Sequence, residues 1–227
     1  RFEALLPNRE RVPTEEYQRG ERIRCYVKSV PGGGNGSEII LSRKDPEFVL
    51  KLFKLEVSEI NDGTIEVKGI AREPGFRTKL AVHSRDEKVD PVGACVGLRG
   101  QRVKNIVREL NNEKIDIIPW DDNIESYVSN ALSPAEIRRM EVHSDRKRIH
   151  IFVDPDQLSL AIGRRGQNAR LTSLLTGWQI DIDSEEEVKV GFEEQVAKAV
   201  EALAAIPGIE KVQADAIVHA GLLTLDA

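Results

Sequence analysis

The sequence predicts an α+β protein of several domains, with two similar units between a β-rich opening and a helical tail. Three observations support this fold class. Residues 1–44 contain short apolar runs that are typical of strands, one order of helices and strands then occurs twice, and the final residues combine helical spacing with many acids. We expect the domains to span 1–44, 45–121, 122–184 and 185–227.

The composition is that of a globular protein whose negative charge is unevenly distributed. Of the 227 residues, 40% are apolar and 31% are charged, and the net charge is -5. The residues after 183 hold nine acids and three bases, which leaves 29 acids and 30 bases before them. A nearly neutral body with local basic clusters can bind a polyanion.

The sequence also indicates the compartment. No apolar run approaches the roughly 18 residues of a transmembrane helix, and no signal peptide opens the chain. Cys25 and Cys95 lie in apolar surroundings without CxxC spacing, so we expect reduced, buried thiols and a cytoplasmic protein with no membrane partner. The opening "RFEALLP" lacks an initiator Met, and we expect the chain to be part of a longer protein.

The first elements are predicted from short patterns. Strands are expected at "RIRCYVKSV" and "SEIILS", joined by a flexible hairpin connection, "PGGGNG". This connection is not a P-loop, because no Gly-Lys-Ser/Thr follows it. A helix is expected over 45–57, with Asp45 as N-cap and Pro46 in the first turn.

The first unit then has two strands, two helices and a final strand. The strands "TIEVKGIARE" and "FRTKLAVHS" form a predicted hairpin, and "PVGACV" leads through "GLRG" into "QRVKNIVREL". Apolar residues of the last segment recur at helical spacing, namely Val103, Ile106, Val107 and Leu110. The strand "KIDIIPW" closes the unit.

The second unit repeats this order, with Gly163 placed 66 residues after Gly97. Its predicted segments are "NIESYVSNAL", "IRRMEVHS", "RIHIFVD", "PDQLSLAI", the loop "GRRG", "QNARLTSLLTG" and "WQIDID". "SPAE" at 133–136 resembles a helical capping box, but the repeat favours a strand starting near it. We expect Asp154 to cap a helix, and Leu171, Leu174 and Leu175 to supply apolar contacts.

The two Gly-x-x-Gly loops suit a phosphate backbone. Glycines allow a close approach, and the following helix directs N–H groups and its positive dipole end at the same space. The first loop adds Arg99 and Arg102, and the second adds Arg164, Arg165 and Arg170. One such loop is more often a simple turn. Because the loop occurs twice with basic residues, nucleic-acid binding is favoured.

"GLRG" and "GRRG" in this order of elements resemble two KH domains of the bacterial type (type II), in which the loop clamps about four nucleotides of a single strand. "AREPGFRTKLAV", "DPVGACVGLRGQRVKNIVREL", "EKIDIIPW" and "LSLAIGRRGQNARL" closely resemble the NusA family of bacterial transcription factors. Residues 1–44 are similar to the carboxy-terminal half of that family's S-one-type barrel. The resemblance therefore implies a partial OB-type β-barrel, two type II KH domains and a helical tail.

The resemblance also implies RNA-binding residues. They are the loops with the helix starts that follow, Gly97, Leu98, Arg99, Gly100, Gln101, Arg102 and Lys104, and Gly163, Arg164, Arg165, Gly166, Gln167, Asn168 and Arg170. Main-chain groups of Ile115–Ile117 and Ile180–Ile182 would line the bases. The implied partners are single-stranded nascent RNA, RNA polymerase and other transcription factors, bound by a monomer. We expect Gly97→Asp or Gly163→Asp to weaken RNA binding and leave the fold intact.

The tail, 185–227, is helical with an "IPGI…AIVHAGL" stretch that resembles a helix-hairpin-helix. Such hairpins can bind a DNA backbone, but the acids bordering this one favour a protein-contacting or packing role. The tail is similar to the start of the helical carboxy-terminal repeats found in some NusA-family members.

An enzyme is not expected. The four histidines, His83, His143, His150 and His219, are scattered, and HExxH, a nucleophile elbow and clustered carboxylates are all missing from the sequence. We expect no metal and no cofactor, and we interpret "SEEE" at 184–187 as a solvated linker. The alternatives are a KH/S-one module of an RNA-processing enzyme such as polynucleotide phosphorylase, whose KH domain precedes its barrel, or a structural assembly module.

Overall fold

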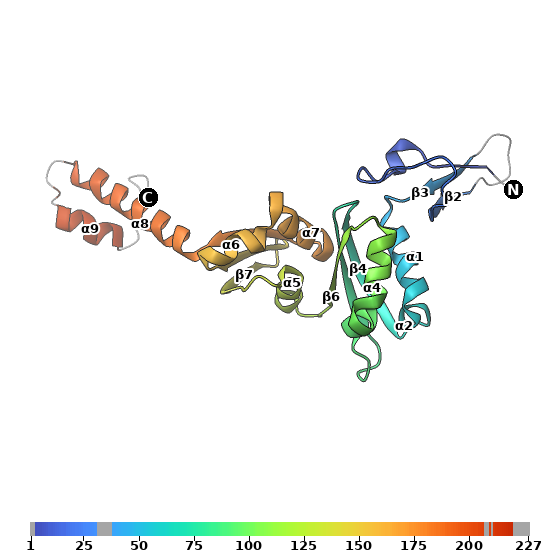
Figure 1. The fold of residues 1–227 in the computed structure, drawn as a ribbon. Helices are drawn as coiled ribbons and strands as arrows, with labels where there is room; N and C mark the ends of the chain where they lie inside the picture. The colour runs from blue at the N-terminus through green and yellow to red at the C-terminus, as the bar shows by residue number, and fades with distance from the viewer. Residues whose placement is uncertain (1–2, 31–37, 207–208, 210, 220–227) are drawn as a thin grey trace.

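The computed structural model describes residues 3–30, 38–206, 209 and 211–219 (Figure 1). An N-terminal sheet, two α+β units and a helical hairpin follow one another in chain order along the molecule. The predicted connection "PGGGNG" lies outside the described residues.

The N-terminal sheet has three short strands, β1 (Ala4–Leu5), β2 (Tyr26–Ser29) and β3 (Ile39–Ser42). Their order is β1-β3-β2, with β1 parallel and β2 antiparallel to β3. Within the described residues this sheet is open. The predicted β-rich opening is therefore present, but the described strands do not close a barrel.

The first α+β unit places its helices on one face of a three-stranded sheet. Its elements are α1 (Pro46–Glu56), α2 (Ser58–Asn61), β4 (Ile65–Glu73), β5 (Arg77–Ser84), α3 (Pro91–Val96), α4 (Gln101–Glu109) and β6 (Lys114–Pro119). The strand order is β4-β5-β6, with β4 antiparallel and β6 parallel to the central β5. The Asp45 carboxylate accepts a hydrogen bond from the Glu47 N–H at 3.0 Å, which confirms the predicted cap of α1.

The second unit repeats this topology. Its elements are α5 (Ile124–Leu132), β7 (Arg139–His143), β8 (Arg148–Val153), α6 (Pro155–Ile162), α7 (Gln167–Thr176) and β9 (Gln179–Ser184). Its sheet has the order β7-β8-β9, again with an antiparallel and a parallel pair. The tail follows as α8 (Glu185–Ala204) and α9 (Lys211–His219). Among the described residues, no helix is both long and apolar enough to span a bilayer.

Three local predictions for the second unit have different outcomes. The strand near "SPAE" begins at Arg139, so the repeat predicted the element correctly. Asp154 occupies the N-cap position of α6 but makes no cap hydrogen bond, because its carboxylate binds the Arg138 guanidinium at 2.8 Å. That predicted cap is wrong. Leu171 and Leu175 are buried, as expected. Leu174 is 65% exposed, so the prediction that it supplies apolar contacts to the core is wrong.

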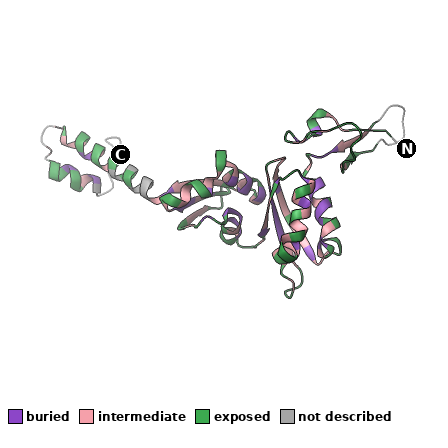
Figure 2. Ribbon diagram, in the orientation of Figure 1, coloured by how far each residue is buried: buried purple, intermediate pink, exposed green. Residues whose placement is uncertain are grey.

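A shared apolar core joins the two units. The face of the first sheet that points away from its own helices carries Ala71, Ala81 and Ile118, and α5 and α7 of the second unit pack on it. A Cβ at Gly69 would lie 3.3 Å from Leu175 Cδ1, so the small residues of β4 and β5 allow α7 to approach closely. Figure 2 shows buried residues on these facing elements. Burial of apolar surface therefore stabilises the junction.

Lys79 adds a polar contact to the same junction. Its side chain is fully buried, and its Nζ donates to the Ala131 carbonyl at the end of α5 at 2.6 Å. The Asp116 carboxylate lies 3.5 Å from Nζ. Burial lowers the pKa of Lys79 to about 8. This lysine thus ties the first sheet to the second unit at a cost in desolvation.

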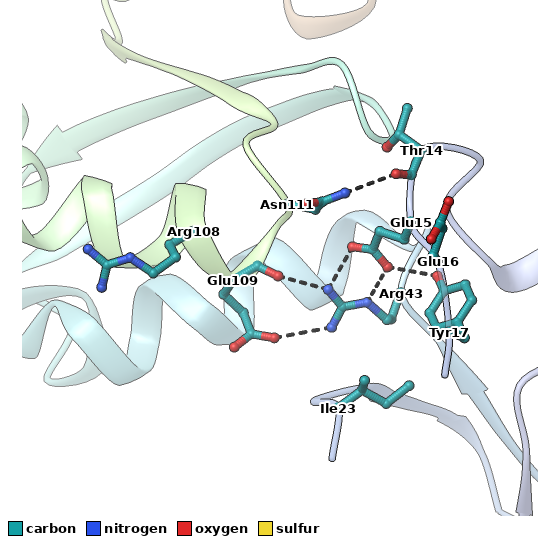
Figure 3. A pocket seen from close by; sticks show the side chains of 9 residues that line it. All are labelled: Thr14, Glu15, Glu16, Tyr17, Ile23, Arg43, Arg108, Glu109 and Asn111. Atoms are coloured by element: carbon teal, nitrogen blue, oxygen red, sulfur yellow. Dashed lines mark hydrogen bonds and ion pairs between the residues drawn. The ribbon is translucent and has the colours of Figure 1, made fainter. Parts of the chain in front are cut away.

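Ion pairs hold the N-terminal segment on the first unit (Figure 3). The buried Arg43 guanidinium contacts the Glu15 carboxylate at 2.5 Å and Glu109 Oε1 at 3.1 Å. These groups border a cleft of about 440 Å³ at the carboxyl end of α4, opposite the end that carries the loop. Nearby, Arg72 and Glu113 form a fully buried pair with N–O distances of 2.9 Å.

Candidate nucleic-acid interface

The two Gly-x-x-Gly loops have the same backbone. Gly97 has φ 73° and ψ 171°, and Gly163 has φ 73° and ψ 173°. This region is essentially restricted to glycine. The third loop residues, Arg99 and Arg165, are both left-handed, with φ near 52° and 53°. The fourth, a glycine in each loop, is left-handed as well, so the predicted repeat extends to the conformation of single residues.

A hydrogen bond closes each turn. The Gly100 N–H donates to the Gly97 carbonyl at 2.9 Å, and the Gly166 N–H donates to the Gly163 carbonyl at 3.1 Å. Helices α4 and α7 begin at the next residue, and neither has a side-chain cap. The positive ends of both helices therefore point at the loops without a capping acceptor in the way.

The loop side chains are presented to solvent. Leu98 is 86% exposed, and Arg99, Arg164 and Arg165 are exposed. None of these three guanidinium groups has a carboxylate partner among the residues that the structure describes. They are available for the phosphates of a polyanion.

Lys104 and Arg170 occupy equivalent positions behind the loops. Lys104 Nζ donates to the Arg99 carbonyl, and an Arg170 NH group donates to the Arg165 carbonyl, both at 3.1 Å. Each side chain thereby supports the left-handed residue of its own loop while adding positive charge beside it.

Arg102 and Asn168 also occupy equivalent positions, and both bind the end of the preceding helix. Arg102 NH1 donates to the Ala94 carbonyl at 2.7 Å. Asn168 is only 3% exposed, and its Nδ2 donates to the Ala161 carbonyl at 3.2 Å. The sequence prediction placed Asn168 against the RNA backbone. Its side chain is buried beneath the loop and holds the end of α6, and its contact with RNA stays a prediction.

The two glutamines that start the helices make different contacts. Gln101 Nε2 donates to Asn105 Oδ1 one turn later at 2.9 Å, within its own helix. Gln167 donates to the carboxylate of Glu73, a residue of the first unit. Sequence reasoning missed Glu73, because it lies 94 residues away in the chain and no local pattern distinguishes it.

Both units match known domain families. Residues 43–120 match the NusA-like first KH domain, and residues 124–190 match the NusA-like second KH domain. The chain belongs to the NusA family. We refer to the two matched ranges as KH1 and KH2.

Three relatives illustrate the similarity, each called transcription termination/antitermination protein NusA. The Halalkalibacterium halodurans protein is 49% identical over 90% of this chain and 54% of its own length. The Bacillus subtilis protein is 48% identical over 83% of this chain and 51% of its own length. The Mycobacterium tuberculosis protein is 51% identical over 79% of this chain and 52% of its own length. The chain therefore spans about half the length of these NusA relatives.

The final strands of KH1 and KH2, β6 and β9, lie at sheet edges. Ile115 and Ile117 pack into the KH1 core, and Ile180 and Ile182 pack into the KH2 core. Their side chains are thus turned to the helices. Main-chain groups of the outer edge are the contacts with bases that the NusA resemblance implied.

The other described residues form neither a metal site nor an activated thiol. No group of three His, Cys, Asp or Glu residues within the described ranges could hold a metal ion. Burial raises the pKa of the Cys95 thiol to about 12, so it is a poor nucleophile. The NusA relatives are transcription proteins and not enzymes, so the RNA-processing enzyme is not favoured.

Proposed function

We propose that this chain is the single-stranded RNA-binding region of a bacterial transcription elongation, pausing, termination and antitermination factor. One observation carries the proposal: two loops of the same glycine-dependent conformation stand on docked KH domains and present arginines that have no carboxylate partner within the described part of the chain. The names of the NusA relatives, which describe transcription termination and antitermination, support it.

Each loop would clamp the RNA backbone. A phosphate would pass over the last glycine of the loop, Gly100 or Gly166, where a Cβ would meet nothing closer than 3.6 Å, toward the amino end of α4 or α7. The proposed contacting residues are the predicted ones, namely Gly97, Leu98, Arg99, Gly100, Gln101, Arg102 and Lys104, and Gly163, Arg164, Arg165, Gly166, Gln167, Asn168 and Arg170. Bases would lie along the main chain of β6 and β9.

Two clamps on one body raise affinity without new contacts, because the second binding event is intramolecular. The RNA would be a nascent transcript, and RNA polymerase and other transcription factors would be the partners. Residues 1–44 would be the carboxy-terminal half of an S-one-type barrel that extends the RNA surface. Phosphate contacts release counterions, so binding should weaken with salt.

The test is fluorescence anisotropy with a labelled single-stranded RNA of about a dozen nucleotides. The variant carries Arg99→Asp and Arg165→Asp. A control carries Arg85→Asp and Arg146→Asp, two exposed arginines outside the loops that change the net charge equally. We expect the loop variant to lose binding and the control to keep most of it, with unchanged circular dichroism. Equal binding by wild type and loop variant would favour a structural assembly module instead.

A further inference from the structure

Glu73 makes a contact that crosses from KH1 to KH2. It is the last residue of β4, and its carboxylate lies against the first turn of α7. Glu73 Oε1 accepts a hydrogen bond from an Arg170 NH group at 2.9 Å, and Glu73 Oε2 accepts one from Gln167. The acidic side chain of one domain thus holds two side chains directly behind the loop of the other.

Arg170 passes this contact on to the loop. One of its NH groups binds Glu73, and the other donates to the Arg165 carbonyl at 3.1 Å. Arg165 has φ 53°, a left-handed conformation that is unfavourable for an arginine and persists only where its surroundings fix it. Glu73, Arg170 and the Arg165 carbonyl therefore form a continuous support for the strained residue of the second loop.

The first loop is supported from within its own domain. Lys104 binds the Arg99 carbonyl as Arg170 binds that of Arg165, but Lys104 has no carboxylate partner among the described residues. The acids behind α4 come from α1 and α2 of KH1. Glu59 pairs with Arg102 at 3.0 Å, and Glu56 accepts from Asn105 at 3.2 Å.

We propose that Glu73 is a positioning residue for the second loop, so that KH2 binds RNA at full strength only while it is docked on KH1. The dependence runs one way, because the first loop has its supports in KH1. This inference rests on the proposed function, namely that both loops bind RNA.

The negative charge of Glu73 beside a loop that binds phosphate is compatible with a positioning role. The Glu73 and Arg170 side chains are 34% and 49% exposed, and an exposed ion pair adds little to stability. An arginine has five N–H donors, and the two contacts described occupy only part of them. Glu73 thus fixes the direction of Arg170 and leaves it donors for a phosphate.

The test compares Glu73→Ala in two backgrounds, each with one loop disabled. Gly100→Asp disables the first loop and Gly166→Asp the second. Both glycines are left-handed, a conformation that Asp tolerates, and their Cβ atoms would meet nothing closer than Lys104 Cε at 3.6 Å. With the first loop disabled, Glu73→Ala should weaken RNA binding roughly threefold to tenfold. With the second loop disabled it should have no effect.

Matched variants sharpen the result. Glu59→Ala should show the opposite pattern, weakening binding only where the first loop is intact. Glu73→Gln keeps an acceptor for Arg170 and should restore most of the affinity that Glu73→Ala loses. In the Arg170→Ala background, Glu73→Ala should cause a smaller loss than in the wild type, because only the Gln167 contact remains to be removed. Without RNA, Glu73→Ala should shift the amide resonances of Arg165 and Gly166 and leave those of Arg99 and Gly100 in place.

Three outcomes would overturn the proposal. Equal losses in both backgrounds would mean a general effect on folding. Tighter binding by Glu73→Ala would make Glu73 a competitor of the phosphate. Unchanged binding in the Gly100→Asp background, with RNA still bound there, would remove the positioning role alone. Failure of the wild-type protein to bind RNA would instead remove the proposed function, and this inference with it.

Discussion

The loop at Gly97–Gly100 and the loop at Gly163–Gly166 have matching backbone angles, yet different neighbours hold them. Behind the first, Arg102 and Asn105 bind Glu59 and Glu56 of the same domain. Behind the second, Gln167 and Arg170 bind Glu73 of the neighbouring domain. The loop of KH1 is thus supported by acids of its own domain, whereas the loop of KH2 is supported by an acid of KH1. A duplicated unit can keep its site geometry while the second copy becomes dependent on the first.

The largest expected effect comes from KH1, on which this comparison depends. Glu113→Ala leaves Arg72 buried without its partner and should lower the free energy of unfolding by about 3–5 kcal/mol. Urea unfolding measures the loss. Glu125→Ala, at an exposed position of α5, is the control and should change stability by less than about 0.5 kcal/mol. Similar losses in both variants would contradict a special role of the buried pair.

The next effect tests the junction through pH. The pKa of Lys79 is lowered by burial to about 8, from 10.5 in an unfolded chain. Between these values the unfolded chain binds more protons than the folded protein, so the free energy of unfolding should rise with pH across this window. Lys79 should account for a rise of roughly 2–3 kcal/mol in the free energy of unfolding across this window. Lys79→Met should lack this rise with pH, as measured by urea unfolding at pH 7.5 to 10.5. A parallel pH dependence in both proteins would refute the assignment.

A smaller effect distinguishes the first glycines of the loops. A Cβ at Gly163 would lie 2.9 Å from the Asn168 main-chain nitrogen, whereas a Cβ at Gly97 would lie 2.7 Å from Arg102 Cγ, an atom that a change of the Arg102 χ1 rotamer can move. Both substitutions are strained, and we expect Gly163→Ala to cost about 2–3 kcal/mol and Gly97→Ala about 1–2 kcal/mol. Thermal unfolding measures the difference. The reverse order would contradict the role given to Asn168. Aspartate at these positions should therefore weaken the fold as well as RNA binding.

The smallest effect is a difference in salt dependence. The second loop presents two arginines, and the first presents Leu98 and Arg99. Each lost phosphate contact should reduce the logarithmic salt slope of RNA binding by ~0.7. The pair Arg164→Gln and Arg165→Gln should therefore reduce the slope about twice as much as Arg99→Gln. Anisotropy titrations at several salt concentrations measure it. Equal slopes would mean that the loops contact the same number of phosphates.

The sequence predicted the repeat, the loops and the order of helices and strands along the chain, because apolar spacing and glycine positions are local signals. It did not predict the support that Asn168 gives the loop, since a polar residue after Gly-x-x-Gly gives no sign that its amide satisfies carbonyls beneath the loop. Asp154 failed as a cap because Arg138, on a neighbouring segment, takes its carboxylate. Glu73 and Lys79 were missed for one reason: each acts across the junction, and the docking of two domains is not encoded in either local pattern.

The junction also decides how many units can be stacked. KH1 receives its neighbour on a face of small residues, where Ala81 pairs with Ile118 in the register of the sheet. At the corresponding face of KH2, Phe152 pairs with Asp183, and Arg148 and His150 bind Asp181 and Asp183. A further copy would meet the Phe152 ring and the Asp183 carboxylate at the positions where KH1 has Ala81 and Ile118. KH2 therefore lacks the small-residue face that receives α7 on KH1, and an open array needs the same receptive face on every repeat.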